Sequence, residues 1–188
     1  MARPRLFDRD EALERAIDAF SEHGYSGTST DDLLTAMDLS RQSLYNAFGD
    51  KRNLYLEALR TYIAQSVSEH LRILNRSASA RKGIEQLLAD FVDRPLRACL
   101  GTHAVCEFGR TDPEITALTD TAAHTLRTAL ERCIAKAKAD GEIAADVDER
   151  AAAHFLGATL SGIKLAARGG ATKDVLRDIA QMALRSLG

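Results

Sequence analysis

The residues best suited to binding chemistry are polar side chains at the start of a short helical pattern. Arg41, Gln42 and Ser43 directly follow Ser40, a residue type that often caps the N-terminus of a helix. The apolar residues after them predict a helix too short to be stable without a partner. A short, supported helix with guanidinium, amide and hydroxyl groups in its first turn can enter a DNA major groove and bind base edges.

A second short helical pattern precedes this one, and a tight break separates the two. Leu33, Leu34 and Met37 give it an apolar face. It opens at Thr28, and Asp31 stands three residues later, which has the form of a capping box. Two short helices in this order predict a helix-turn-helix.

Residues 8–60 resemble the helix-turn-helix domain of the TetR/AcrR transcriptional regulators. The segment that carries the resemblance is L-S-R-Q-S-L-Y-N-A-F-G-D-K-R-N-L, preceded by H-G-Y-S-G-T-S-T. The residues in register are Gly24, Thr28, Leu33, Ser40, Leu44, Tyr45, Phe48, Lys51 and Leu54. Two positions depart from the family pattern. Asp38 stands where the family usually has Gly in the turn, and Ala47 where it often has His, which puts one phosphate contact in doubt.

The resemblance implies an all-α fold of about nine helices. A helix-turn-helix head would occupy residues 1–49, and a helical ligand-binding and dimerisation body residues 50–188. Apolar spacing and cap residues predict the helices themselves. Their expected spans are about 8–23, 29–37, 41–47, 51–75, 79–93, a sixth from after Pro95 to 108, 112–140, from 146 or 148 to 168, and 172–187. The expected caps of the last three are Asp112, then Asp146 or Asp148, and Thr172. The long fourth helix would join head and body.

DNA binding by the head would use two sets of side chains. Arg41, Gln42 and Asn46 are expected to read bases, and Thr28, Tyr45 and Lys51 to contact the backbone, although Tyr45 also suits a purely core position. Arg3 and Arg5 form either an arm on phosphate or in the minor groove, or a disordered tail. The full set of expected DNA-binding residues is Arg3, Arg5, Thr28, Ser40, Arg41, Gln42, Ser43, Tyr45, Asn46 and Lys51.

Net charge opposes this interpretation. The chain carries a formal charge of −2, and residues 1–60 hold eight basic and eleven acidic side chains. Proteins that bind nucleic acid usually present a basic surface. DNA binding depends on the electrostatic potential at the contact surface and not on the net charge of the chain. We therefore expect a modest non-specific affinity for DNA and a shallow dependence of that affinity on salt. A helical protein–protein adaptor that has kept the helix-turn-helix as a scaffold stays open as the alternative.

Three polar residues of the body fall on one face of a predicted helix. Cys99, His103 and Cys106 are spaced i, i+4, i+7, which invites a zinc site, but no fourth ligand stands at a matching spacing. We therefore expect no metal, while a thiol sensor for oxidants or electrophiles stays open. The residues expected to line a pocket for a small, mostly apolar effector are Phe91, Cys99, His103, Cys106, Phe108 and His154.

Other function classes find no support in the chain. It has no G-x-S-x-G, no Gly-rich phosphate loop and no recognisable carboxylate pair, so we expect neither an enzyme nor a cofactor. It has no long apolar run and no secretory signal, so we expect no membrane contact. Three cysteines without a signal favour a reducing cytoplasm.

The last two predicted helices carry apolar stripes, and the resemblance implies that they form a homodimer. The expected interface residues are Phe155, Thr159, Ile163, Ile179 and Met182. A twofold dimer matches a palindromic operator. The resulting hypothesis is a ligand-responsive transcriptional regulator, a repressor that a small-molecule inducer releases from double-stranded DNA.

Overall fold

The computed structural model describes residues 7–94 and 99–188, and these form nine α-helices and no strand. The helices are α1 (Arg9–Gly27), α2 (Thr30–Met37), α3 (Arg41–Phe48), α4 (Lys51–Arg76), α5 (Ala80–Asp93), α6 (Leu100–Phe108), α7 (Pro113–Ala139), α8 (Glu149–Arg168) and α9 (Lys173–Arg185). The predicted all-α fold is confirmed. No helix in the described part of the chain is long and apolar enough to cross a membrane.

Helix starts follow the predicted cap residues because short polar side chains bind the free N–H groups of a first turn. The Asp148 carboxylate accepts from the Ala151 N–H at 2.7 Å. Thr172 does the same for α9 through the Val175 N–H. Asp112 accepts from the N–H groups of Glu114 and Ile115 and so caps α7.

The chain forms two compact units that differ from the predicted division at residue 49. The first takes in the described residues of Met1–Ile63 and Ala98–Thr116, and the second those of Ala64–Arg97 and Ala117–Gly188. The first unit therefore contains α6 and the beginnings of α4 and α7 in addition to α1–α3.

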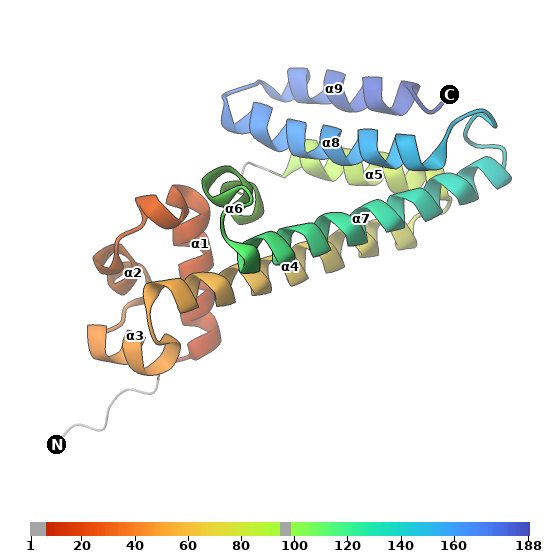
Figure 1. Ribbon diagram of the computed structural model, residues 1–188. Coiled ribbons are helices and arrows are strands. Elements are labelled where there is room, and N and C mark those ends of the chain that lie inside the picture. Colours follow the sequence, from red (N-terminus) through yellow and green to blue (C-terminus); the bar gives the residue numbers. More distant parts are fainter. Residues whose placement is uncertain (1–6, 95–98) are drawn as a thin grey trace. The chain divides into compact units, whose positions relative to one another are not determined.

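The second unit holds one apolar core. Helices α5, α8 and α9 pack against one another, and α8 and α9 run side by side (Figure 1). Leu88, Leu130, Leu156 and Ile163 are among the side chains that the core removes from solvent. Because burial of large aliphatic side chains is the main source of folding free energy, this core stabilises the unit.

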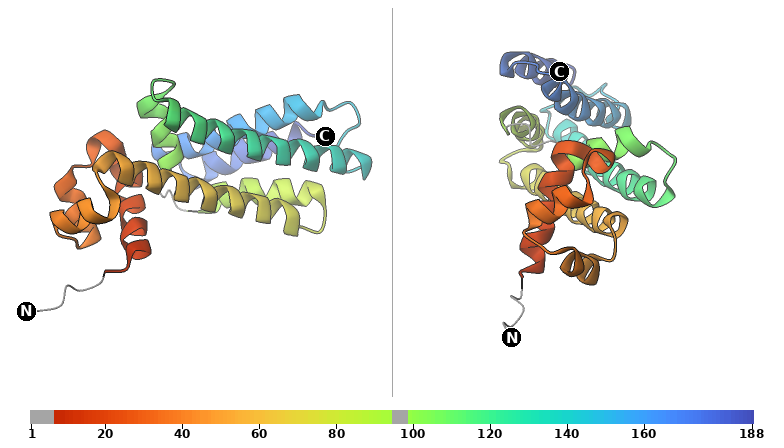
Figure 2. Two further views of the ribbon diagram at one scale, coloured as in Figure 1. Left: turned by 60° about the horizontal axis from the view of Figure 1, so that its bottom comes forward. Right: turned by 90° about the vertical axis from the view of Figure 1, so that its left-hand side faces the viewer.

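The first unit gathers its short helices around α1. Helices α1, α2 and α3 cluster beside the start of α4 in each view of Figure 2, and α1 packs against α2 and α6. Phe20 and Tyr55 are buried and meet edge to face, with ring centroids 5.0 Å apart. Leu44 and Phe48 of α3 are buried as well, so neighbouring helices support α3, which is too short to be stable by itself.

A histidine is enclosed in the second unit between an aromatic ring and cations. The His70 ring lies 4.9 Å from the Phe91 ring, and the Lys164 ammonium lies over the same ring at 4.7 Å. Burial first, and then the charges of Lys164 and Arg94, lower the pKa of His70 to about 4, against the opposing effect of Glu69. The imidazole is therefore neutral in the folded protein near neutral pH.

This burial predicts a pH dependence of stability. Between about pH 6.5 and about pH 4 the unfolded chain takes up a proton at His70 that the folded chain refuses, so the free energy of unfolding falls as the pH falls. The loss attributable to His70 is at most about 2–3 kcal/mol. Urea denaturation between these pH values should show that the free energy of unfolding falls less for His70→Phe than for the wild type. His154→Gln, which alters an exposed histidine, should behave like the wild type. The same dependence of unfolding free energy on pH in the wild type and in His70→Phe would contradict the lowered pKa of His70.

Candidate nucleic-acid interface

The first short helix of the motif starts after a break in α1. Gly24 has φ 75° and ψ −178° inside α1, a conformation that L side chains rarely adopt. Thr28 is fully buried, and its hydroxyl donates to the Gly24 carbonyl oxygen at 2.6 Å. The Thr28 side chain therefore stabilises the break, while the expected contact of Thr28 with the DNA backbone stays a prediction.

The predicted capping box of Thr28 and Asp31 was wrong by one residue. Ser29 caps α2, because its hydroxyl accepts from the Asp32 N–H at 3.1 Å while its own N–H donates to the Asp32 carboxylate at 2.8 Å. These contacts, the hydroxyl hydrogen bond first, lower the pKa of Asp32. Thr28 cannot fill this role, since its hydroxyl is already bonded to Gly24.

The turn between α2 and α3 is made by Asp38. Its φ of 53° and ψ of 47° place it in the left-handed region. This is the position at which the TetR/AcrR pattern usually has glycine. The Asp38 N–H bonds carbonyl oxygens of the last turn of α2, and the Leu39 N–H donates to the Leu34 carbonyl oxygen at 3.1 Å. These bonds close the helix end, so an aspartate supplies a turn for which glycine is the usual residue.

Helix α3 divides its residues between two faces. Leu44 and Phe48 are buried, whereas Arg41, Gln42 and Asn46 are exposed. Ser40 begins the helix, and its hydroxyl accepts from the N–H of Ser43 at 3.1 Å. The structure thus brings the expected base-reading side chains together on one open surface.

Tyr45 adds a large ring to that surface. It is 44% exposed, which disfavours the purely core position. The Gln42 amide nitrogen donates to the Asn46 amide oxygen at 2.9 Å, so the two amides lie next to each other on α3.

Arg41 is paired within the head. Its guanidinium bonds the Asp31 carboxylate at 2.6 Å, and both side chains are more than half exposed. Exposed pairs of this kind contribute only about 0–1 kcal/mol. A phosphate or a guanine edge can therefore replace Asp31 at small cost.

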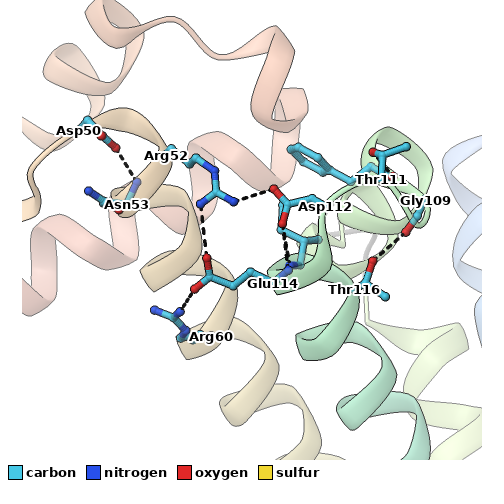
Figure 3. A network of polar contacts seen from close by, with 11 residues as sticks. Asp50, Arg52, Asn53, Arg60, Gly109, Thr111, Asp112, Glu114 and Thr116 are labelled. Carbon is cyan, nitrogen blue, oxygen red and sulfur yellow. Dashed lines mark hydrogen bonds and ion pairs between the residues drawn. The ribbon is translucent and has the colours of Figure 1, made fainter.

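The two cations that open α4 have different surroundings. The Lys51 ammonium lies over the Tyr25 ring at 4.2 Å. The Arg52 guanidinium instead points toward the start of α7, where it bonds Asp112 at 2.7 Å and Glu114 at 3.4 Å (Figure 3). Arg60 bonds the same Glu114 carboxylate. Lys51 can therefore bind a DNA phosphate, whereas the charge of Arg52 is compensated by carboxylates within the unit.

Arg3 and Arg5 lie outside the described residues.

The six residues expected to line an effector pocket divide between the two units. Cys99, His103, Cys106 and Phe108 belong to the first unit, and Phe91 and His154 to the second. Cys106 and His154 are exposed. The Phe108 ring packs on Tyr25 and Tyr55, with centroids 5.6 Å and 5.7 Å away.

A hollow of about 680 Å³ lies elsewhere, between α1 and α2, and none of its lining residues is an expected effector contact. The described part of the chain shows no group of three or more His, Cys, Asp or Glu side chains placed to hold a metal ion.

The expected dimer residues also separate into two groups. Phe155 and Met182 are 47% and 61% exposed, whereas Ile163 is fully buried in the core and Thr159 and Ile179 are half-buried. Two exposed apolar side chains, Leu165 and Val175, extend the open surface of α8 and α9 and were not predicted. Sequence alone could have found Leu165, since it falls outside the apolar stripe of α8.

Comparison with known proteins places both parts of the chain. Residues 12–58 match the model of the bacterial regulatory proteins of the tetR family, and residues 80–183 match the tetracyclin repressor-like C-terminal domain. YezE of Bacillus subtilis, an uncharacterised HTH-type transcriptional regulator, is 30% identical and covered over the full length of both chains. ComR of Escherichia coli, an HTH-type transcriptional repressor, is 31% identical, with 97% of this chain and 90% of ComR covered.

A solved structure resembles the whole chain. It is a cysteine mutant of the TetR family transcriptional regulator CifR, complexed with 26-bp double-strand operator DNA. It is 33% identical, with a TM-score of 0.82 and full coverage of both chains.

Proposed function

We propose that this chain, which belongs to the TetR family of bacterial transcriptional regulators, is a ligand-responsive repressor that binds a palindromic operator as a homodimer. The observation that carries the proposal is the surface of α3, where Arg41, Gln42 and Asn46 stand exposed above a buried apolar face. ComR, a relative of nearly the same length, is named as a repressor, and CifR was solved with operator DNA.

The chemistry of α3 suits direct readout of bases. An arginine can bond the O6 and N7 atoms of guanine with two hydrogen bonds, and a glutamine or asparagine can bond N6 and N7 of adenine. Arg41 and the adjacent amides of Gln42 and Asn46 supply these groups. Tyr45 and Lys51 would contact phosphates and set the orientation of the helix.

Substitutions on α3 test this assignment. Arg41→Ala or Gln42→Ala should each weaken binding to a palindromic duplex, selected by the wild-type protein from a random-sequence pool, by about 1–3 kcal/mol. Lys51→Ala should weaken binding to selected and unrelated duplexes alike. Fluorescence anisotropy measures both affinities.

Arg15→Ala is the matched control, because it removes an exposed cation of α1 that pairs with Glu11. Unchanged affinity in both α3 variants would refute the base-reading role. If the wild-type protein retains no duplex at all, the result would favour the alternative of a helical protein–protein adaptor.

The homodimer rests on the open apolar surface of α8 and α9. Phe155, Leu165, Val175 and Met182 are exposed there. A Cβ atom added at Gly162, two turns after Phe155 on α8, would meet no heavy atom within 4 Å, so a partner helix could approach closely. Two copies of this surface would bury one another around a twofold axis, which a palindromic operator requires.

Charge placed on this surface should separate the protomers. Phe155→Glu with Met182→Glu should give a monomer in analytical ultracentrifugation at micromolar concentration, because two carboxylates cannot be buried unpaired in an apolar interface. Val105→Glu places the same charge at an exposed apolar position of α6 and should leave the dimer intact. Sedimentation of the double variant as a dimer would show that another surface is used.

Release from DNA is proposed to follow effector binding in the helical body. The C-terminal family model covers α5 to α8 and most of α9, and this range contains all six expected effector contacts. An effector lowers operator affinity only to the extent that it prefers the conformation that does not bind DNA.

A thiol sensor is the second candidate, and one contact favours it. The Tyr62 hydroxyl donates to the Cys99 sulfur at 3.2 Å, and Cys99 stands at the N-cap of α6. Hydrogen-bond donors and helix N-termini both stabilise a thiolate. Burial instead raises the pKa of Cys133 and makes it a poor nucleophile.

Thiol reagents distinguish the two modes of control. If Cys99 is the sensor, N-ethylmaleimide or hydrogen peroxide should lower operator affinity of the wild type and of Cys106→Ser, but not of Cys99→Ser. If an apolar effector acts alone, these reagents should have no effect, while members of a panel of apolar molecules should release DNA. Failure of both treatments would indicate a constitutive DNA-binding protein.

A further inference from the structure

A carboxylate of α6 binds the backbone at the break in α1. The Glu107 side chain accepts from the Tyr25 N–H at 2.7 Å with one oxygen and from the Ser26 N–H at 3.0 Å with the other. Consecutive N–H groups that point to one side form a binding site for an anion. Here the chain supplies the anion itself, from a residue 82 positions away in the sequence.

Gly24 is shaped for this contact. A Cβ atom at Gly24 would lie 2.7 Å from a Glu107 carboxylate oxygen and 2.9 Å from the carboxyl carbon. Any other residue would also be strained by the positive φ. The glycine therefore serves both the direction of the chain and the close approach of Glu107.

The backbone that Glu107 binds is linked directly to residues proposed to bind DNA. Tyr25, whose N–H Glu107 binds, carries the ring on which the Lys51 ammonium lies. Two residues after Ser26 comes Thr28, which is bonded to Gly24, and then the Ser29 cap of α2. A change in the backbone at Tyr25 and Ser26 would alter the start of α2 and the position of Lys51 together.

Residues next to Glu107, at the end of α6 and the start of α7, make further contacts with α1 and α4. Phe108, the next residue of α6, packs on the Tyr25 ring. Asp112 and Glu114, beyond α6, bind Arg52 at the start of α4 (Figure 3). Hydrogen bonds to a charged group are stronger than those between neutral groups, so Glu107 contributes more to this arrangement than an ordinary surface side chain.

We propose that Glu107 is a positioning residue for operator binding, because its carboxylate holds the α1–α2 connection in the geometry that α3 and Lys51 need to engage DNA together. The inference rests on the proposed function. Since Glu107 lies in the last turn of α6, a displacement of this helix would change these two hydrogen bonds directly.

The sign of the effect separates positioning from simple electrostatics. Glu107 is an exposed acid in an acidic head, so removing its charge should strengthen DNA binding if only the potential matters. A positioning role predicts the opposite for the selected duplex. Asp10→Asn removes an exposed carboxylate from the first turn of α1 and is the matched charge control.

The experiment compares wild type, Glu107→Gln, Glu107→Ala and Asp10→Asn on a palindromic duplex selected by the wild-type protein and on an unrelated duplex. Circular dichroism confirms that each protein is folded at the temperature used. Affinity of Glu107→Ala for the selected duplex should fall about tenfold, the loss of roughly one base contact, while affinity for the unrelated duplex stays equal or rises. Glu107→Gln keeps one acceptor oxygen and should fall between.

Amide hydrogen exchange supplies an independent readout. The N–H groups of Tyr25 and Ser26 should lose protection in Glu107→Ala and keep it in Asp10→Asn. Tighter binding of Glu107→Gln to both duplexes, as in Asp10→Asn, would overturn the inference while leaving the proposed function intact. A wild-type protein that retains no duplex would overturn the proposed function and the inference with it.

Discussion

The break in α1 at Gly24 is the constraint on which the DNA-binding head depends. A helix that continued through this point would carry the chain past the place where α2 must begin. Gly24 adopts the positive φ, Thr28 bonds its carbonyl oxygen, and Glu107 binds the next two N–H groups. One glycine backbone and two side chains thus stabilise one change of direction, and α2 and α3 take their positions from it.

The acidic composition of the head is reconciled with DNA binding by the way its charges are paired. Arg9 bonds Glu57, and Arg52 bonds Asp112 and Glu114, so these cations and carboxylates compensate one another. Arg41 pairs with a solvent-exposed acid and can exchange it for DNA. The expected result is weak attraction to DNA in general and dependence on specific contacts for affinity, which suits a protein that must find one site.

Local signals in the sequence predicted most of the fold. Cap residues such as Asp148 and Thr172 and the apolar spacing between them placed the helices to within a few residues, because caps act on neighbouring N–H groups. The α2 cap was placed one residue early, since Thr28 and Ser29 are both good caps and only the structure shows that Thr28 is already bonded to Gly24. Glu107 had no local signal, because its partners lie 81 and 82 residues away. For α8, sequence could not tell core from surface, so Ile163 was expected at an interface and proved buried.

Selection of duplexes from a random-sequence pool by the wild-type protein tests the central claim most directly. Sequencing of the retained duplexes should reveal one palindromic motif, with half-sites about one helical turn apart or a multiple of that, roughly 34–36 Å per turn. Binding to that motif should depend on Arg41 and Gln42. Retained duplexes without a shared motif, or a motif recognised equally well after both side chains are replaced by alanine, would contradict an account in which α3 reads the operator.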